Sequence, residues 1–110
     1  MSRLETVTPF GAGAVAFAAG EVKTSRWYDL LDVGCNGLMA YQFATTGSVE
    51  VKVQRAIERD SPAPVDVVAT THAAASGIKD VDVVPARFVR FVATEKASAA
   101  ATLKMTTLFV

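Results

Sequence analysis

Few residues in this sequence could do chemistry, and each of them stands alone. The one histidine, His72, lies among Thr and Ala with no second imidazole and no nearby acid, so it lacks the positioned partner that a general base needs. We therefore expect an exposed loop histidine. The one cysteine, Cys35, has no neighbouring base or basic cluster to activate its thiol, which favours a small buried hydrophobe. The sequence predicts no catalytic residue.

Metal and cofactor sites are also not predicted. One His and one Cys exclude a Cys/His metal cluster and a disulfide within the chain. Asp29 and Asp32 form the only close acidic pair in an early loop, which is too few ligands for calcium, so we expect two solvated turn carboxylates. Gly11-Ala12-Gly13 is not a dinucleotide-binding loop, because Ala16 stands where the third glycine is required.

An aromatic pair, Trp27-Tyr28, is the one candidate for ligand recognition. Sugar binding needs exposed aromatic rings beside polar groups, and this pair alone offers them. Adjacent residues of a strand face opposite ways, so one of the two rings is expected in the core.

Charge and hydropathy exclude other classes of partner. Eleven Lys and Arg balance eleven Asp and Glu, and the net charge of zero disfavours nucleic acid, whose binders carry a basic excess. No run of about eighteen apolar residues occurs, so we expect no membrane span. The apolar stretch Phe10 to Ala19 resembles part of a signal peptide, but Glu5 offsets Arg3 before it. We expect a product without a signal peptide, with secretion as the alternative.

Alternating side chains predict strands through most of the chain. Val49, Val51, Val53 and Ile57 share one face of a strand from Ser48 to Glu58, while Arg55 marks a strand end or bulge. A strand from Leu38 to Thr45 is expected to form a hairpin with it through Thr46-Gly47. Further strands are expected at Arg26 to Leu31, Val65 to Ala69, Ile78 to Val84, Arg87 to Thr94 and Ala101 to Phe109, the last two as a pair, with Thr70 to Gly77 as a connection.

These short strands at spacings near ten residues predict an all-β fold. We expect a single-domain antiparallel β-sandwich, jelly-roll-like, over residues 25–110. Residues 1–24 contain few bulky groups, so they form an extended N-terminal arm or the first strand of the sandwich.

Two stretches carry a resemblance to known families. Pro85 to Val92, which reads PARFVRFV, and the closing strand Leu103 to Val110 resemble strands of discoidin-like and galactose-binding-like jelly rolls. Gly47 to Val53 resembles the central strand of β-sandwich modules in bacteriophage virion proteins. The resemblance implies a structural role in a symmetric assembly without cofactors.

The function expected from the sequence is a non-enzymatic virion structural protein, decorating a capsid or joining a tail in many symmetric copies. Its partners would be copies of itself and other virion proteins, and it would be made in the host cytoplasm. The alternative is a carbohydrate-binding module of the same fold, with a glycan bound at Trp27 or Tyr28. A small enzyme that depends on His72 is the third hypothesis.

Overall fold

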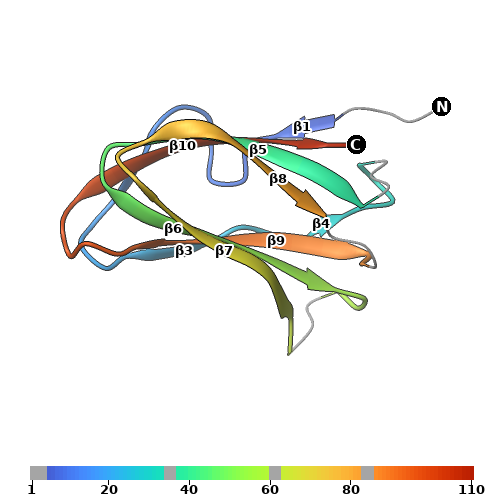
Figure 1. Ribbon diagram of the computed structural model, residues 1–110. Coiled ribbons are helices and arrows are strands. Elements are labelled where there is room, and N and C mark those ends of the chain that lie inside the picture. Colours follow the sequence, from blue (N-terminus) through green and yellow to red (C-terminus); the bar gives the residue numbers. More distant parts are fainter. Residues whose placement is uncertain (1–4, 34–36, 60–62, 83–85) are drawn as a thin grey trace.

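The computed structural model describes residues 5–33, 37–59, 63–82 and 86–110, and in these residues it consists of two stacked β-sheets (Figure 1). No helix long and apolar enough to cross a membrane occurs in this part of the chain. Ten strands form the sheets: β1 (Glu5–Val7), β2 (Val15–Phe17), β3 (Val22–Thr24), β4 (Tyr28–Asp29), β5 (Leu38–Thr45), β6 (Ser48–Ala56), β7 (Val65–Ala73), β8 (Ser76–Asp82), β9 (Phe88–Glu95) and β10 (Ala101–Phe109).

The strand order is that of a jelly roll. Sheet A has the order β1-β10-β5-β8, with β2 also paired to β10, and sheet B has the order β3-β9-β6-β7, with β4 also paired to β9. Every pairing is antiparallel. The predicted all-β sandwich is confirmed. The segment expected as an arm or first strand supplies β1 and β2 to sheet A and β3 to sheet B in its described part, residues 5–24.

Consecutive strands mostly lie in different sheets, which corrects two predicted pairings. β5 belongs to sheet A and β6 to sheet B, so the expected hairpin through Thr46-Gly47 is a crossing between the layers. β9 and β10 are likewise in opposite sheets. Alternation of side chains shows which face of a strand is buried but does not identify its partner, which is why both predictions were wrong.

The chain from Thr70 to Gly77 is also different from the prediction, which made it a loop. β7 continues to Ala73, and β8 begins at Ser76. Ala74, with φ 45°, makes the sharp turn between them in the left-handed region that non-glycine residues rarely adopt. Thr and Ala have no property that stops a strand. The prediction of a loop from the small residues of this stretch therefore placed the turn wrongly.

The core lies between the two sheets and contains the alternate residues that the patterns predicted. Met39, Tyr41 and Phe43 of β5 face inward, as do Val49, Val51 and Val53 of β6. The register of β6 against β7 shifts between Val53 and Gln54, beside the bulge expected near Arg55. Ile57 is 76% exposed, so its predicted place on the inner face is wrong; β6 ends one residue earlier.

Candidate functional site on the outer face of sheet A

The outer face of sheet A carries a row of small and polar side chains. Three neighbouring strands supply it, because β5 pairs with β10 on one side and with β8 on the other. Residues opposite one another share a face, so Lys104 lies beside Ala44 and Thr106 beside Gln42, and on the far side Ser76 lies beside Ala44. The alanines between longer polar residues leave the surface hollow.

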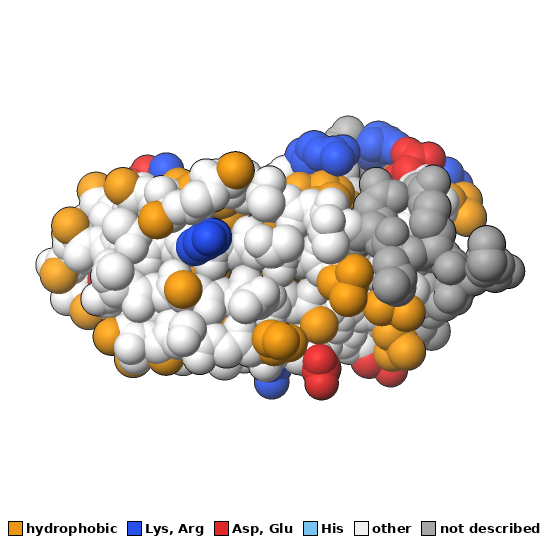
Figure 2. All heavy atoms as spheres, turned by 90° about the horizontal axis from the view of Figure 1, so that it is seen from above, with side chains coloured by type: hydrophobic (Ala, Val, Ile, Leu, Met, Phe, Trp, Pro, Cys, Tyr) orange, Lys and Arg blue, Asp and Glu red, His pale blue; other side chains and the backbone are white. Residues whose placement is uncertain are grey.

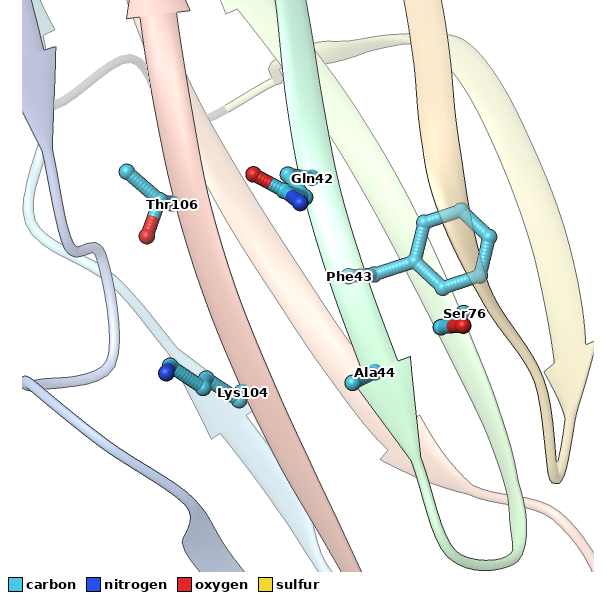
Figure 3. Close-up of a pocket in the computed structure, with 6 residues that line it drawn as sticks. All are labelled: Gln42, Phe43, Ala44, Ser76, Lys104 and Thr106. Carbon is cyan, nitrogen blue, oxygen red and sulfur yellow. The ribbon is translucent and has the colours of Figure 1, made fainter.

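A hollow of about 290 Å³ lies at this place (Figure 3). Its lining comes from Gln42, Phe43 and Ala44 of β5, Ser76 of β8, and Lys104 and Thr106 of β10. In the close-up the Phe43 ring extends from β5 toward β8, and Gln42 lies between β5 and β10.

Two further hollows continue along the same strands. One of about 240 Å³ shares Gln42 and Thr106 with the first and adds Ala40, Ile78, Leu108 and Thr6. Another, of about 500 Å³, shares Ala40 with the second and reaches Leu38, Val110, Asp80 and Asp82, together with Met39 and Val81. We call the three together the sheet A groove. Its length along the strands suits an extended ligand better than a compact one.

Three polar side chains of the first hollow are available to a ligand. Among the residues that the structure describes, the side chains of Gln42, Lys104 and Thr106 have no hydrogen-bond or ion-pair partner. Viewed from above, this face has one Lys or Arg side chain in its middle, and the other charged side chains, both basic and acidic, lie toward its margins (Figure 2). The groove can therefore donate and accept hydrogen bonds without a strong field of either sign.

A buried histidine supports the Phe43 ring from below, which corrects the expectation of an exposed loop residue. His72 is 7% exposed, lies in β7, and stacks on Phe43 with ring centroids 3.6 Å apart. Its Nε2 is 2.7 Å from the hydroxyl of Tyr41. Burial, with a smaller effect of Lys79, lowers the pKa of His72, while burial raises the pKa of Tyr41 to about 12. Both rings are thus neutral at pH 7.

Trp27 and Tyr28 point to opposite sides of sheet B, and neither ring is exposed. Tyr28 is 4% exposed and packs in the core against Phe91 and Phe109. Trp27 is 8% exposed, and the guanidinium of Arg90 covers its ring at 4.6 Å. The prediction that one of the two lies in the core is correct for Tyr28. The expected exposed ring is absent, because an arginine occupies the face that a sugar would stack on.

Asp29 is buried and paired, so the prediction of a solvated turn carboxylate is wrong for it. Arg87 donates from Nη2 to Oδ2 at 3.2 Å and from Nε to Oδ1 at 3.4 Å. The backbone N–H of Leu31 also donates to Oδ1. The hydrogen bonds from Arg87 lower the pKa of Asp29 and raise that of Arg87. Asp32 is exposed, as predicted.

Carboxylates line the groove only at one end, where Asp80 and Asp82 belong to the third hollow. In the described residues no group of three or more His, Cys, Asp or Glu side chains could hold a metal ion. The first two hollows have no carboxylate or imidazole in their lining. Cys35 lies outside the residues that the structure describes.

The sequence contained part of the signal for this groove. Alternation placed Thr102, Lys104 and Thr106 on the face of their strand away from Leu103, and this face is the outer one. It could not reveal that Gln42 and Ser76 lie beside them, because β5 and β10 were expected to pair with β6 and β9, and no partner was predicted for β8.

Comparison with known proteins identifies the fold but no family. No protein-family model matches this sequence, and neither does any curated protein. Among solved structures, CBM29_1, a family 29 carbohydrate-binding module from Piromyces equi, is 12% identical with a TM-score of 0.54, over 97% of this chain and 91% of that one. A variant of CBM29-2, made to probe ligand recognition by family 29 modules, is 9% identical with a TM-score of 0.55, over 99% and 92%.

A third structure resembles the chain more distantly. Drosophila melanogaster CENP-C bound to CAL1 is 10% identical, with a TM-score of 0.43, and the match covers 84% of this chain and 56% of that one. At such identities the likeness concerns the shape of the sandwich. The two family 29 modules share that shape over nearly the whole of both chains.

Proposed function

We propose that this protein binds a neutral carbohydrate chain in the sheet A groove and catalyses no reaction. The observation that carries the proposal is the set of three polar side chains, Gln42, Lys104 and Thr106, that line the hollow without partners. A sugar chain presents many hydroxyl groups, each a donor and an acceptor. The amide of Gln42 and the hydroxyl of Thr106 can serve both roles, and Lys104 donates.

The apolar part of the groove fits the same class of ligand. Sugar rings carry C–H faces as well as hydroxyls, and binding sites for small ligands combine apolar lining with a few placed polar groups. Ile78, which is 69% exposed, and Leu108 supply apolar contacts along the groove. The shared fold of two carbohydrate-binding modules supports the proposal through shape alone.

The virion role, with self-association and particle partners, stays a prediction from the sequence. A virion role needs contacts between copies of the protein, and the features of the sheet A groove do not indicate such contacts. We therefore place carbohydrate binding first.

Retention on neutral polysaccharides in affinity electrophoresis tests the proposal. Thr106→Val keeps the shape of the side chain and removes the hydroxyl, and Gln42→Ala removes the amide beside it. Each should weaken binding several-fold, since a hydrogen bond contributes about 0.5–1.5 kcal/mol. Thr94→Val makes the same change on β9 of the opposite sheet, at a partly exposed position, and is the matched control.

The control should bind as the unaltered protein does. Equal binding by Thr106→Val and Thr94→Val would contradict the site. Failure of every neutral polysaccharide to retard the protein would contradict the function itself.

A further inference from the structure

A second apolar cluster lies on the outer side of sheet B, apart from the core. Trp27, Ala56 and Phe88 form it, and Phe88 is only 5% exposed. Phe88 precedes Val89, which points into the core, so its ring faces the other way. Arginines rather than apolar groups cover this cluster.

Two of these arginines share one aromatic ring. The guanidinium carbons of Arg59 and Arg87 lie 4.9 Å and 5.3 Å from the centre of the Phe88 ring. Arg90 covers Trp27 and donates from Nε to the side-chain oxygen of Gln54 at 2.8 Å. Cations thus cover the rings of Phe88 and Trp27, and neither of these two rings is open for stacking on a sugar.

The same two arginines converge on one carboxylate oxygen. Nη2 of Arg87 is 3.2 Å and Nη2 of Arg59 is 3.7 Å from Oδ2 of Asp29, whose side chain is only 7% exposed. The side chains of Arg87 and Arg59 are 52% and 57% exposed, so part of each guanidinium faces solvent. Each guanidinium has five N–H donors, and Asp29 engages only a few of them.

Among the residues that the structure describes, two guanidinium groups share one buried carboxylate here. Exposed Asp32 adds a weaker attraction to Arg87. Arg90, nearby, pairs with a neutral amide. An oxyanion that met the outward N–H groups would relieve the repulsion between the arginines, in the two-pronged geometry that guanidinium offers to carboxylate and sulfate.

We propose that Arg59 and Arg87 form a second binding site, for the carboxylate or sulfate group of an acidic polysaccharide. The ligand class rests on the proposed carbohydrate-binding function, whereas the site is separate from the sheet A groove and lies on the opposite sheet.

Dextran, carboxymethyl dextran and dextran sulfate share one backbone and test the site directly in affinity electrophoresis. The two acidic polymers should bind at least tenfold more tightly than dextran at low salt. Arg59→Gln should remove that preference, while Arg87 keeps Asp29 paired and the fold intact. Arg59→Lys should restore part of this preference, because lysine returns the positive charge but lacks the planar guanidinium with its paired N–H donors.

Arg26→Gln is the matched control. Arg26 is also exposed and also lies over an aromatic ring, that of Tyr28 at 4.3 Å, but it makes no contact with Asp29. It should bind the acidic polymers as the unaltered protein does. An equal loss in Arg26→Gln and Arg59→Gln would overturn the proposal, because general charge attraction would then explain the binding.

Two further comparisons distinguish a failure of this inference from a failure of the proposed function, and distinguish acidic sugars from other anions. Neutral glycan binding that is lost in Gln42→Ala, together with unchanged dextran sulfate binding in Arg59→Gln, overturns the arginine site alone. Binding to duplex DNA or to vesicles of anionic phospholipid that is as tight as binding to the acidic dextrans, and equally sensitive to Arg59→Gln, overturns the choice of an acidic sugar.

Discussion

At the scale of single residues, the groove depends on side chains buried beneath it. Phe43 lines the first hollow and rests on His72, which in turn is bonded to Tyr41. Gly77 fits closely beside the Phe43 ring, because a Cβ at that position would lie 3.3 Å from its Cζ. The orientation of Phe43 is therefore fixed from two sides.

The lowered pKa of His72 makes stability depend on pH. In the unfolded chain His72 binds a proton near its ordinary pKa of about 6.5, whereas the native state resists protonation. Between pH 7 and 5 the unfolded state therefore binds more protons, and the free energy of unfolding should fall as the pH falls. Urea unfolding at pH 7, 6 and 5 measures this dependence.

His72→Gln is the control, since the amide can keep a hydrogen bond to Tyr41 without titrating. Its stability should be nearly constant over the same range. Asp29 and Glu95, with lowered pKa values, begin to lose their contributions when the pH falls into the ordinary carboxyl range, and lose them fully below their lowered native values. If the free energy of unfolding of His72→Gln fell with pH as steeply as that of the unaltered protein, His72 would not be the group responsible.

The site residues were predicted poorly for a physical reason. Trp27 and Tyr28 were chosen because aromatic rings can stack on sugars, but burial decides whether they do, and burial depends on distant residues such as Arg90 and Phe91. His72 appeared isolated because its partners, Tyr41 and Phe43, lie about thirty residues earlier in the chain. Sequence neighbours give no information on such contacts.

At the scale of elements, the crossing from β5 to β6 depends on Gly47. A Cβ at this position would lie 2.9 Å from the Cβ of Ala101, at the start of β10. Gly47→Ala should therefore destabilise the protein by about 1–3 kcal/mol, the usual cost of overpacking. Thermal unfolding measured by circular dichroism is sufficient to detect this change.

Removing the opposing methyl group provides the compensating change. Ala101→Gly in the Gly47→Ala background should recover part of the lost stability, because it relieves the contact directly. If Gly47→Ala alone is as stable as the unaltered protein, close approach at this crossing is not what requires glycine.

The strands themselves were largely predictable, and their partners were not. β5 and β10 begin and end where alternation placed them, since that signal comes from the residues of the strand alone. Pairing depends on which edges meet after the chain crosses between sheets. Turns as short as Thr46-Gly47 and Ala74-Ala75 allow either a hairpin or a crossing, so the local sequence did not distinguish them.

At the scale of the whole molecule, the two long edges of the sandwich are poorly suited to pairing with another copy. Where β6 pairs with β7, Val53 is opposite Val68 and the next residue, Gln54, is opposite Asp66. Val67 of β7 therefore has no partner in β6 and forms a bulge. In β8, Lys79 is opposite the buried Tyr41 and so points inward from the edge. Bulges and inward charges are features by which proteins prevent edge association. Self-assembly through β7 or β8 is therefore disfavoured.

The whole surface divides into two faces of different chemistry. The outer face of sheet A carries the groove, with Lys104 near its middle and Asp80 and Asp82 at one end, whereas the outer side of sheet B carries arginines over aromatic rings. A sugar chain with acidic groups could engage both faces only by wrapping around the sandwich or by joining two molecules. Separate variants on each face therefore report on separate sites.

The most direct test of carbohydrate binding in the sheet A groove is a titration with neutral linear hexasaccharides, followed by amide chemical shifts in nuclear magnetic resonance. We predict that the largest shifts occur at Gln42, Ala44, Ser76, Lys104 and Thr106, and that β9 of the opposite sheet is little affected. Shifts confined to sheet B, or no saturable shifts with any hexasaccharide, would contradict the account.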